Sequence, residues 1–217
     1  MADHSILERP ARELSPEDVA SAWPDPIRPG LRLRPAYASD VVVGRIGGDP
    51  QLPEHLPWPT WEGYGPLTFV ASIDCSRVPA DVQGLGLPED GTLLFFLFDA
   101  RIDVAWFDLR ERDLRGVSRV LHVPANSPVR QRATPAEITP HPLTALAVRG
   151  LESRAECDAA PLHCLGGRLR PPHDRVRLLR LDGFHGWGDA GAHQWLIRPE
   201  DLTAGRLDAT VYRLDHG

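Results

Sequence analysis

The chain has no lysine among its 217 residues, so all 24 of its basic residues are arginine. This absence excludes Schiff-base chemistry and lysine general-base catalysis. It also excludes a phosphate-binding loop of the kind that requires a lysine. Cysteine is scarce as well, because Cys75, Cys157 and Cys164 form an odd set without a Cys-x-x-Cys pair. We therefore expect reduced thiols in a cytoplasmic protein, and no disulfide framework.

Long hydrophobic runs and a basic surplus are missing too. The longest wholly apolar run, Leu93–Phe98, is far too short to span a bilayer, and the first residues lack the pattern of a signal peptide. The net charge is −6, with −9 over residues 1–108 and +3 over residues 109–217. A general nucleic-acid binder needs a basic face, which only residues 168–180 approach. We expect neither a membrane nor a nucleic-acid partner.

Proline is what the chain has in excess, with 22 residues, about twice the average usage. Such a density leaves little room for long helices or central strands. The sequence therefore predicts a mainly β fold of short strands, with an ordinary apolar fraction of 42% to form its core. Strands are predicted from apolar or alternating runs at Leu31–Arg34, Val41–Arg45, Leu67–Asp74, Thr92–Asp99, Asp103–Leu109, Val117–Val123, Val176–Asp182, Ala192–Leu196 and Thr210–Leu214.

Helices and loops complete this prediction. Short helices are expected near 15–22 and 199–204, where proline and acidic residues open each segment. Residues 49–66 and 124–142 carry five prolines each, and we expect both to be long loops without regular elements. The first would be held by aromatic packing or would be a binding loop. Residues 143–148 fit either a strand or a helical turn.

A pattern near residues 44–100 recurs near residues 163–200. Each copy has a glycine pair, a strand closed by aspartate, an acid-containing turn that ends in glycine, and an aromatic strand. We interpret this as an internal duplication of a β-hairpin unit, whose copies pair to bury a shared apolar face. The expected organisation is a single β-rich domain over 27–217, preceded by a helical appendage over 1–26.

Several motifs carry a family resemblance. The chain has GGDPQLP at 47–53, WP at 58–59, PLTF at 66–69, LPEDGTLLFF at 87–96, and WGDAG followed by IRPEDL within 187–202. Together they resemble the YwqG-like family, bacterial proteins defined by a domain of unknown function. The resemblance covers 27–217 and implies a mostly β, roll-like domain around a partial repeat. It implies no catalytic residues, and Arg168–Pro171 depart from the tyrosine and proline often found there.

Histidines gather in the last third of the chain. His163, His173, His185 and His193 fall within 31 residues, interspersed with Cys157, Cys164, Asp174 and Asp189. Zinc would need three or four such groups to converge in a tetrahedral arrangement, and these spacings match no compact ligand pattern. We therefore expect no metal and no cofactor.

Candidate catalytic groups are few. Cys164 follows His163, and Ser72 and Ser76 flank Asp74, but sequence neighbours rarely form a triad and no GxSxG motif is present. Asp189, in a Gly-Asp-Ala-Gly turn, either fixes the hairpin or serves catalysis. The enzymatic hypothesis is a hydrolase-like site of Asp189, His185 and His163 between the two repeat units.

The leading hypothesis is a non-enzymatic binding protein. Trp58, Trp61, Tyr64 and Trp187 lie in predicted loops, where aromatic residues either cover the ends of the core or line a binding groove. Rigid aromatic anchors of this kind are favoured at interfaces, and the acidic first half would attract a basic partner. The sequence thus favours recognition of a protein partner, of the kind that neutralises a toxin or serves a secreted-effector system.

Overall fold

The fold is known from a computed structural model, which describes residues 30–79, 86–98, 116–133, 141–147, 163–166, 174–182 and 191–215. It is mainly β, as the sequence predicts. The strands are β1 Gly30–Pro35, β2 Val42–Ile46, β3 Gln51–Pro53, β4 Thr60–Trp61, β5 Gly65–Pro66, β6 Thr68–Asp74, β7 Thr92–Leu97, β8 Ser118–Val123, β9 Val129–Gln131, β10 His141–Ala147, β11 His163–Gly166, β12 Val176–Asp182, β13 Ala192–Ile197 and β14 Val211–Asp215. The helical segments are η2 Cys75–Arg77, α4 Pro199–Thr203 and η4 Leu207–Ala209.

One antiparallel sheet of ten strands organises the molecule. Its order is β14-β13-β12-β11-β1-β10-β2-β6-β7-β8. The strands β3 and β9 form a separate two-stranded ribbon, and β4 and β5 form another. The two hairpins of the predicted repeat, β6–β7 and β12–β13, therefore belong to the same sheet and are joined through β11, β1, β10 and β2.

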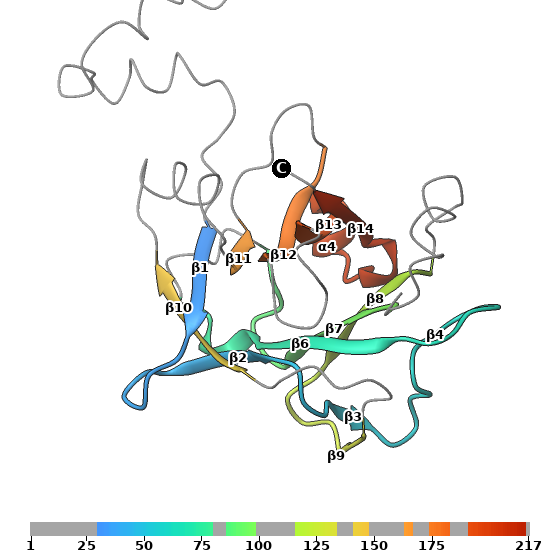
Figure 1. Cartoon of the computed structure of the whole chain (residues 1–217), viewed down its shortest axis with the longest axis horizontal. Helices are drawn as coiled ribbons and strands as arrows, with labels where there is room; N and C mark the ends of the chain where they lie inside the picture. Colours follow the sequence, from blue (N-terminus) through green and yellow to red (C-terminus); the bar gives the residue numbers. More distant parts are fainter. Residues whose placement is uncertain are drawn as a thin grey trace, which may run out of the picture.

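The large sheet is strongly bent, so that β12, β13 and β14 come to lie over β7 and β8 (Figure 1). The Phe95 ring of β7 meets the Trp195 ring of β13 edge to face, with 5.5 Å between the centroids. The 3-10 helix η4 packs against β8 and brings the two ends of the sheet together. The main core thus lies inside the bend, where both halves of the sheet bury their apolar faces.

The central strands are apolar on both sides because both sides are covered. Phe96, the neighbour of Phe95, points to the outer side of the sheet and packs against Phe69 and Trp58 at centroid distances of 5.5 and 5.6 Å. Strands covered on both faces form continuous apolar runs such as TLLFFL in β7. This is why β6, β7, β12 and β13 could be predicted almost to the residue.

The prediction of loops without regular elements was wrong for 49–66 and 124–142. The first stretch contains β3, β4 and β5, and the second contains β9 and the start of β10. Pro53 and Pro66 are tolerated because β3 and β5 belong to two-stranded ribbons, in which each strand has a free edge that needs no N–H donor. Pro142 is different, because it is the second residue of β10, which lies inside the large sheet. Residues 141–147, which include most of the undecided segment, are a strand between β1 and β2.

The two predicted repeat hairpins agree in several details. Both β6 and β12 have seven residues, and both interrupt their pairing near the start, between Phe69 and Ala71 and between Arg177 and Leu179. Both end in an aspartate that pairs with the first residue of the next strand. These agreements are compatible with a duplication, which stays a prediction.

Several predictions fall outside the described residues. They are the helix near 15–22, the appendage over 1–26 and the strand Asp103–Leu109. The second predicted helix is confirmed as α4, which begins with Pro199 followed by Glu200 and Asp201.

Candidate binding cleft

Trp61 is a core residue. It is 7% exposed, stacks on Tyr64 with 3.9 Å between the ring centroids, and meets Phe98 edge to face at 5.3 Å. Tyr64 remains 39% exposed on the outer side of this stack. Of the two alternatives for these loop aromatic residues, covering the core therefore describes Trp61, while Tyr64 is open to a partner.

Trp58 anchors the loop that precedes β4. Its Nε1 donates a hydrogen bond of 2.8 Å to the Leu67 carbonyl oxygen, while the Arg132 guanidinium lies over its ring. Arg132 also donates from Nη1 to the Leu56 carbonyl oxygen at 2.7 Å. These contacts fix the proline-rich segment between the sheet and the strand β9. The fourth predicted anchor, Trp187, lies outside the described residues.

The proposed hydrolase residues are only partly placed. His163 lies in β11, where its Nδ1 accepts a hydrogen bond of 3.3 Å from the Asp182 backbone N–H. Asp189 and His185 lie outside the described residues, so their convergence with His163 stays untested. The neighbouring Cys164 is fully buried and accepts a 3.5 Å contact from Arg177 Nη1. Because successive strand residues point to opposite faces, Cys164 and His163 do not form a pair.

Other singled-out residues have local partners. His193 is 2% exposed in β13 and its Nδ1 lies 2.7 Å from the Tyr212 hydroxyl. Ser76 donates to Asp74 from Oγ at 2.6 Å and from its backbone N–H at 3.1 Å, and the second of these bonds caps η2. Within the described part of the chain, no three His, Cys, Asp or Glu side chains come close enough to hold a metal ion. His173 and Cys157 are outside that part.

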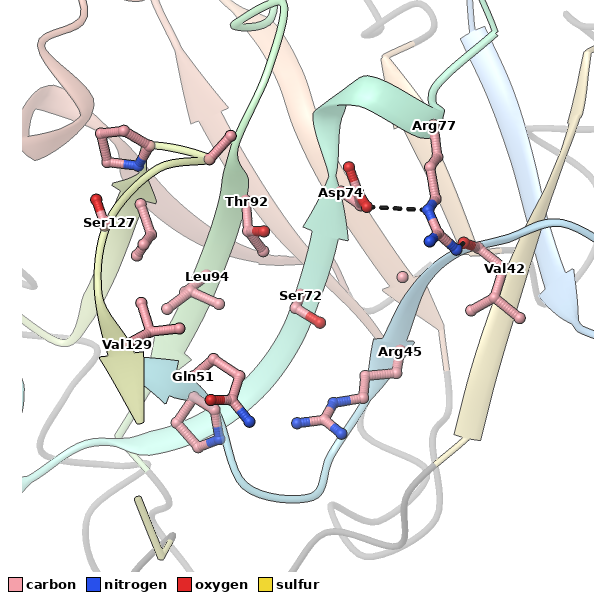
Figure 2. A pocket seen from close by; sticks show the side chains of 15 residues that line it. Val42, Arg45, Gln51, Ser72, Asp74, Arg77, Thr92, Leu94, Ser127 and Val129 are labelled. Atoms are coloured by element: carbon pink, nitrogen blue, oxygen red, sulfur yellow. Dashed lines mark hydrogen bonds and ion pairs between the residues drawn. The ribbon is translucent and has the colours of Figure 1, made fainter. Parts of the chain in front are cut away.

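A cleft lies on the outer side of the sheet. It has a volume of about 610 Å³ and lies between β2, β6 and β7 on one side and the β8–β9 turn and β3 on the other (Figure 2). The floor comes from Arg45, Ser72, Asp74, Thr92 and Leu94, and the rim includes Gln51, Ser127 and Val129. This volume is within the range of small-molecule sites, about 300–1,000 Å³.

The register of three strands brings the floor together. Arg45 of β2 pairs with Ser72 of β6, which pairs with Leu94 of β7. In the next row Asp74 pairs with Thr92. Residues directly opposite on antiparallel strands share a face, so these polar side chains all point into the cleft, as Figure 2 shows.

Gly44 allows β2 to lie close to β6 at this place. A Cβ atom at residue 44 would collide with the Ser72 carbonyl oxygen and would come within 2.9 Å of Ile73 Cδ1. Glycine is therefore required by the close approach of the two backbones. Gly44 is itself one of the lining residues of the cleft.

Both arginines of the cleft are held by backbone carbonyl groups. Arg45 donates from Nη2 to the Asp49 carbonyl oxygen, and Arg77 donates from Nη1 to the Val42 carbonyl oxygen at 3.1 Å. Arg77 also forms an ion pair of 3.1 Å with Asp74 (Figure 2). Arg45, Asp74 and Arg77 are the charged lining residues, so the cleft carries one net positive charge.

The chemistry of this lining is that of binding. Two guanidinium groups and three hydroxyls supply hydrogen-bond donors, and Leu94, Val123 and Val129 supply apolar surface. The sequence singles out Ser72 only as a candidate nucleophile and gives no role to Arg45 or Thr92. In the sequence, Arg45 stands out only as a polar residue within an apolar strand, and Thr92 only as the polar first residue of another. The sequence does not show that these strands bring their polar side chains into one cleft.

A second, shallower hollow of about 540 Å³ lies between β9 and the β4–β5 hairpin. It is lined by Trp58, Thr60, Pro66 and residues 130–133. We call the segments around it, β3, β9 and the β4–β5 hairpin, the ribbon surface. Among the described residues, no helix has the length and apolar character needed to cross a membrane.

The comparisons with known proteins bear on the family. No curated protein matches the chain. The model of one family, described as Domain of unknown function (DUF1963), matches residues 44–162 and thus includes the end of β2, the strands β3 to β10 and the whole floor of the cleft. Because this match covers more than half of the 217 residues, the chain belongs to the DUF1963 family.

Proposed function

We propose that the protein is a non-enzymatic, cytoplasmic recognition module that binds a partner protein through the ribbon surface. The observation that carries this proposal is the presentation of exposed apolar side chains on a rigid support. Tyr64 is 39% exposed and Val129 is 41% exposed, and the hollow between their segments is walled by the fixed Trp58. Preformed apolar and aromatic anchors lower the entropic cost of association and often dominate its free energy.

The net charge of the first half of the chain and the state of its cysteines support the same proposal. The first half of the chain has a net charge of −9, which would accelerate encounter with a basic partner. The described cysteines, Cys75 and Cys164, are buried thiols outside any disulfide, as is common in reducing compartments. Neutralisation of a toxin, or service to a secreted-effector system, is the biological setting that we propose for such a module.

The test is affinity capture from the native cell, followed by calorimetry with the purified partner. The informative variant is Tyr64→Ala/Val129→Asp, which removes two exposed anchors, and a melting curve shows whether it stays folded without the stack of Tyr64 on Trp61. We expect a stoichiometric partner with wild type and binding at least about tenfold weaker with the variant, because anchor residues typically contribute more than 1 kcal/mol each.

The chain offers a matched control. Tyr37 and Val41 are 72% and 66% exposed in the turn between β1 and β2, far from β4 and β9 in Figure 1. Tyr37→Ala/Val41→Asp makes the same chemical change and should leave binding unaltered. The proposal is wrong if wild type captures no stoichiometric partner, or if both double variants bind it equally well.

A further inference from the structure

We propose that the cleft over β2, β6 and β7 binds a small organic acid, with the carboxylate of the ligand on Arg45. This inference concerns a different cavity and a different class of ligand from the partner protein proposed above, although Val129 borders both surfaces. It starts from the charge balance of the lining. Asp74 offsets the charge of Arg77 at 3.1 Å, whereas within the described residues Arg45 has no carboxylate partner.

The Arg45 guanidinium is positioned before any ligand arrives. Its bond to the Asp49 carbonyl oxygen uses one N–H group, and a guanidinium has about five in a planar fork. The remaining N–H groups suit the two oxygens of a carboxylate, which arginine binds in a bidentate manner. The side chain is half-buried, so water and salt weaken this attraction less than on an open surface.

Ser72 adds a donor at the same place. It is the direct cross-strand partner of Arg45, and Figure 2 shows both side chains on the cleft side of the sheet. A carboxylate oxygen bound to Arg45 could accept a further hydrogen bond from the Ser72 hydroxyl. Phosphate would also suit these donors, but the apolar surface of the cleft favours an acid with a hydrocarbon body.

The apolar part of the lining begins on the floor itself. Leu94 is the next residue in the row of Arg45 and Ser72, and Val123 and Val129 continue the lining toward the rim. Val129 is 41% exposed, so a ligand that covers it removes apolar surface from water. A ligand whose carboxylate binds Arg45 and whose hydrocarbon group covers Leu94, Val123 and Val129 would contact both the charged and the apolar lining of the cleft.

The test is a titration of the full chain followed by NMR at the backbone amides of Ser72 and Thr92. The probes are hexanoate and benzoate, with hexanamide and benzamide as uncharged counterparts of the same shape. We expect saturable shifts with the acids and binding at least about tenfold weaker for the amides, because hydrogen bonds to charged groups contribute more than neutral ones.

Two substitutions should act in opposite directions. Arg45→Gln should weaken acid binding at least about tenfold, while Asp74→Asn should strengthen it, because it frees the charge of Arg77 and keeps an oxygen to cap η2. Arg206→Gln, outside the cleft, should change nothing. Melting curves of each variant report whether it is folded.

Three outcomes would overturn the inference. They are the absence of saturable shifts with both acids, equal binding of acids and amides, and unchanged affinity in a folded Arg45→Gln variant. A doubly blocked aspartyl peptide provides a further arm. If this peptide binds more tightly than the free acids, the carboxylate comes from a polypeptide, and the assignment to small organic acids is wrong.

Discussion

Gly44 is the residue on which the shape of the cleft most directly depends. We expect Gly44→Ala to destabilise the protein by about 1–3 kcal/mol, the usual cost of overpacking. The new methyl group would meet the Ser72 carbonyl oxygen, which cannot rotate away without breaking the pairing of β2 with β6. Urea unfolding measures the change, and Ser72→Ala, which adds no atom, is the control. An unchanged midpoint for Gly44→Ala would show that the strands are not so close.

Cys75 should make the fold sensitive to alkali. Burial raises the pKa of its thiol from an ordinary value of 9.0 to about 11. The folded state therefore binds the proton more tightly than the unfolded state. The stabilisation is fully present below pH 9 and is lost as the pH rises from about 9 to about 11, by an amount on the order of 2 kcal/mol.

The measurement is the free energy of unfolding at a series of alkaline pH values, for wild type and Cys75→Ser. Burial also raises the pKa of Tyr212, so part of the alkaline loss should persist in the variant. The slope between pH 9 and 11 should nevertheless be smaller for Cys75→Ser. Equal slopes in the two proteins would contradict the assignment of this proton to Cys75.

Single loop residues show where sequence reasoning reaches its limit. Nothing local distinguishes Trp61 from Tyr64, three residues later, yet one is buried and the other is exposed. Both rings meet Phe98, which follows β7, but Trp61 also packs against the backbone of Gly116, where a Cβ atom would come within 2.7 Å of its ring. Contacts between residues so distant in sequence cannot be read from the composition of a loop.

At the scale of elements, the strands of the large sheet were largely predictable, because their apolar runs are long enough to be distinct. The strands of the ribbon surface were not, since β4 and β5 have two residues each and β5 includes proline. Their pairing depends on the loop fixed by Trp58 and Arg132. Local propensity therefore predicts no strand there, and tertiary contacts decide.

The cleft is a property of neighbouring elements and not of any motif. Arg45 and Ser72 are 27 positions apart in the sequence and meet because β2 pairs with β6 in one register. A shift of that register by one residue would turn these side chains to the other face of the sheet. The sequence could therefore supply the residue types of the site but not their combination.

At the scale of the whole molecule, the two halves of the chain share one sheet and one core. The sheet passes from β8 to β14 through hydrogen-bonded neighbours, and the contact between Phe95 and Trp195 joins the halves inside the bend. A chain so connected should unfold cooperatively, because neither half can lose its strands without exposing the apolar face of the other.

We therefore expect a single unfolding transition in urea, with Trp fluorescence and far-ultraviolet circular dichroism giving the same midpoint. Phe95→Ala should lower the free energy of unfolding by about 3–5 kcal/mol, since it leaves a cavity at the junction of the halves. Its unfolding should remain a single transition, because the continuous sheet still couples the two sides. Tyr37→Ala, at an exposed turn, is the control. Two separate transitions in wild type would mean that the halves are independent units, and a Phe95→Ala change below about 1 kcal/mol would mean that the packing inside the bend does not hold them together.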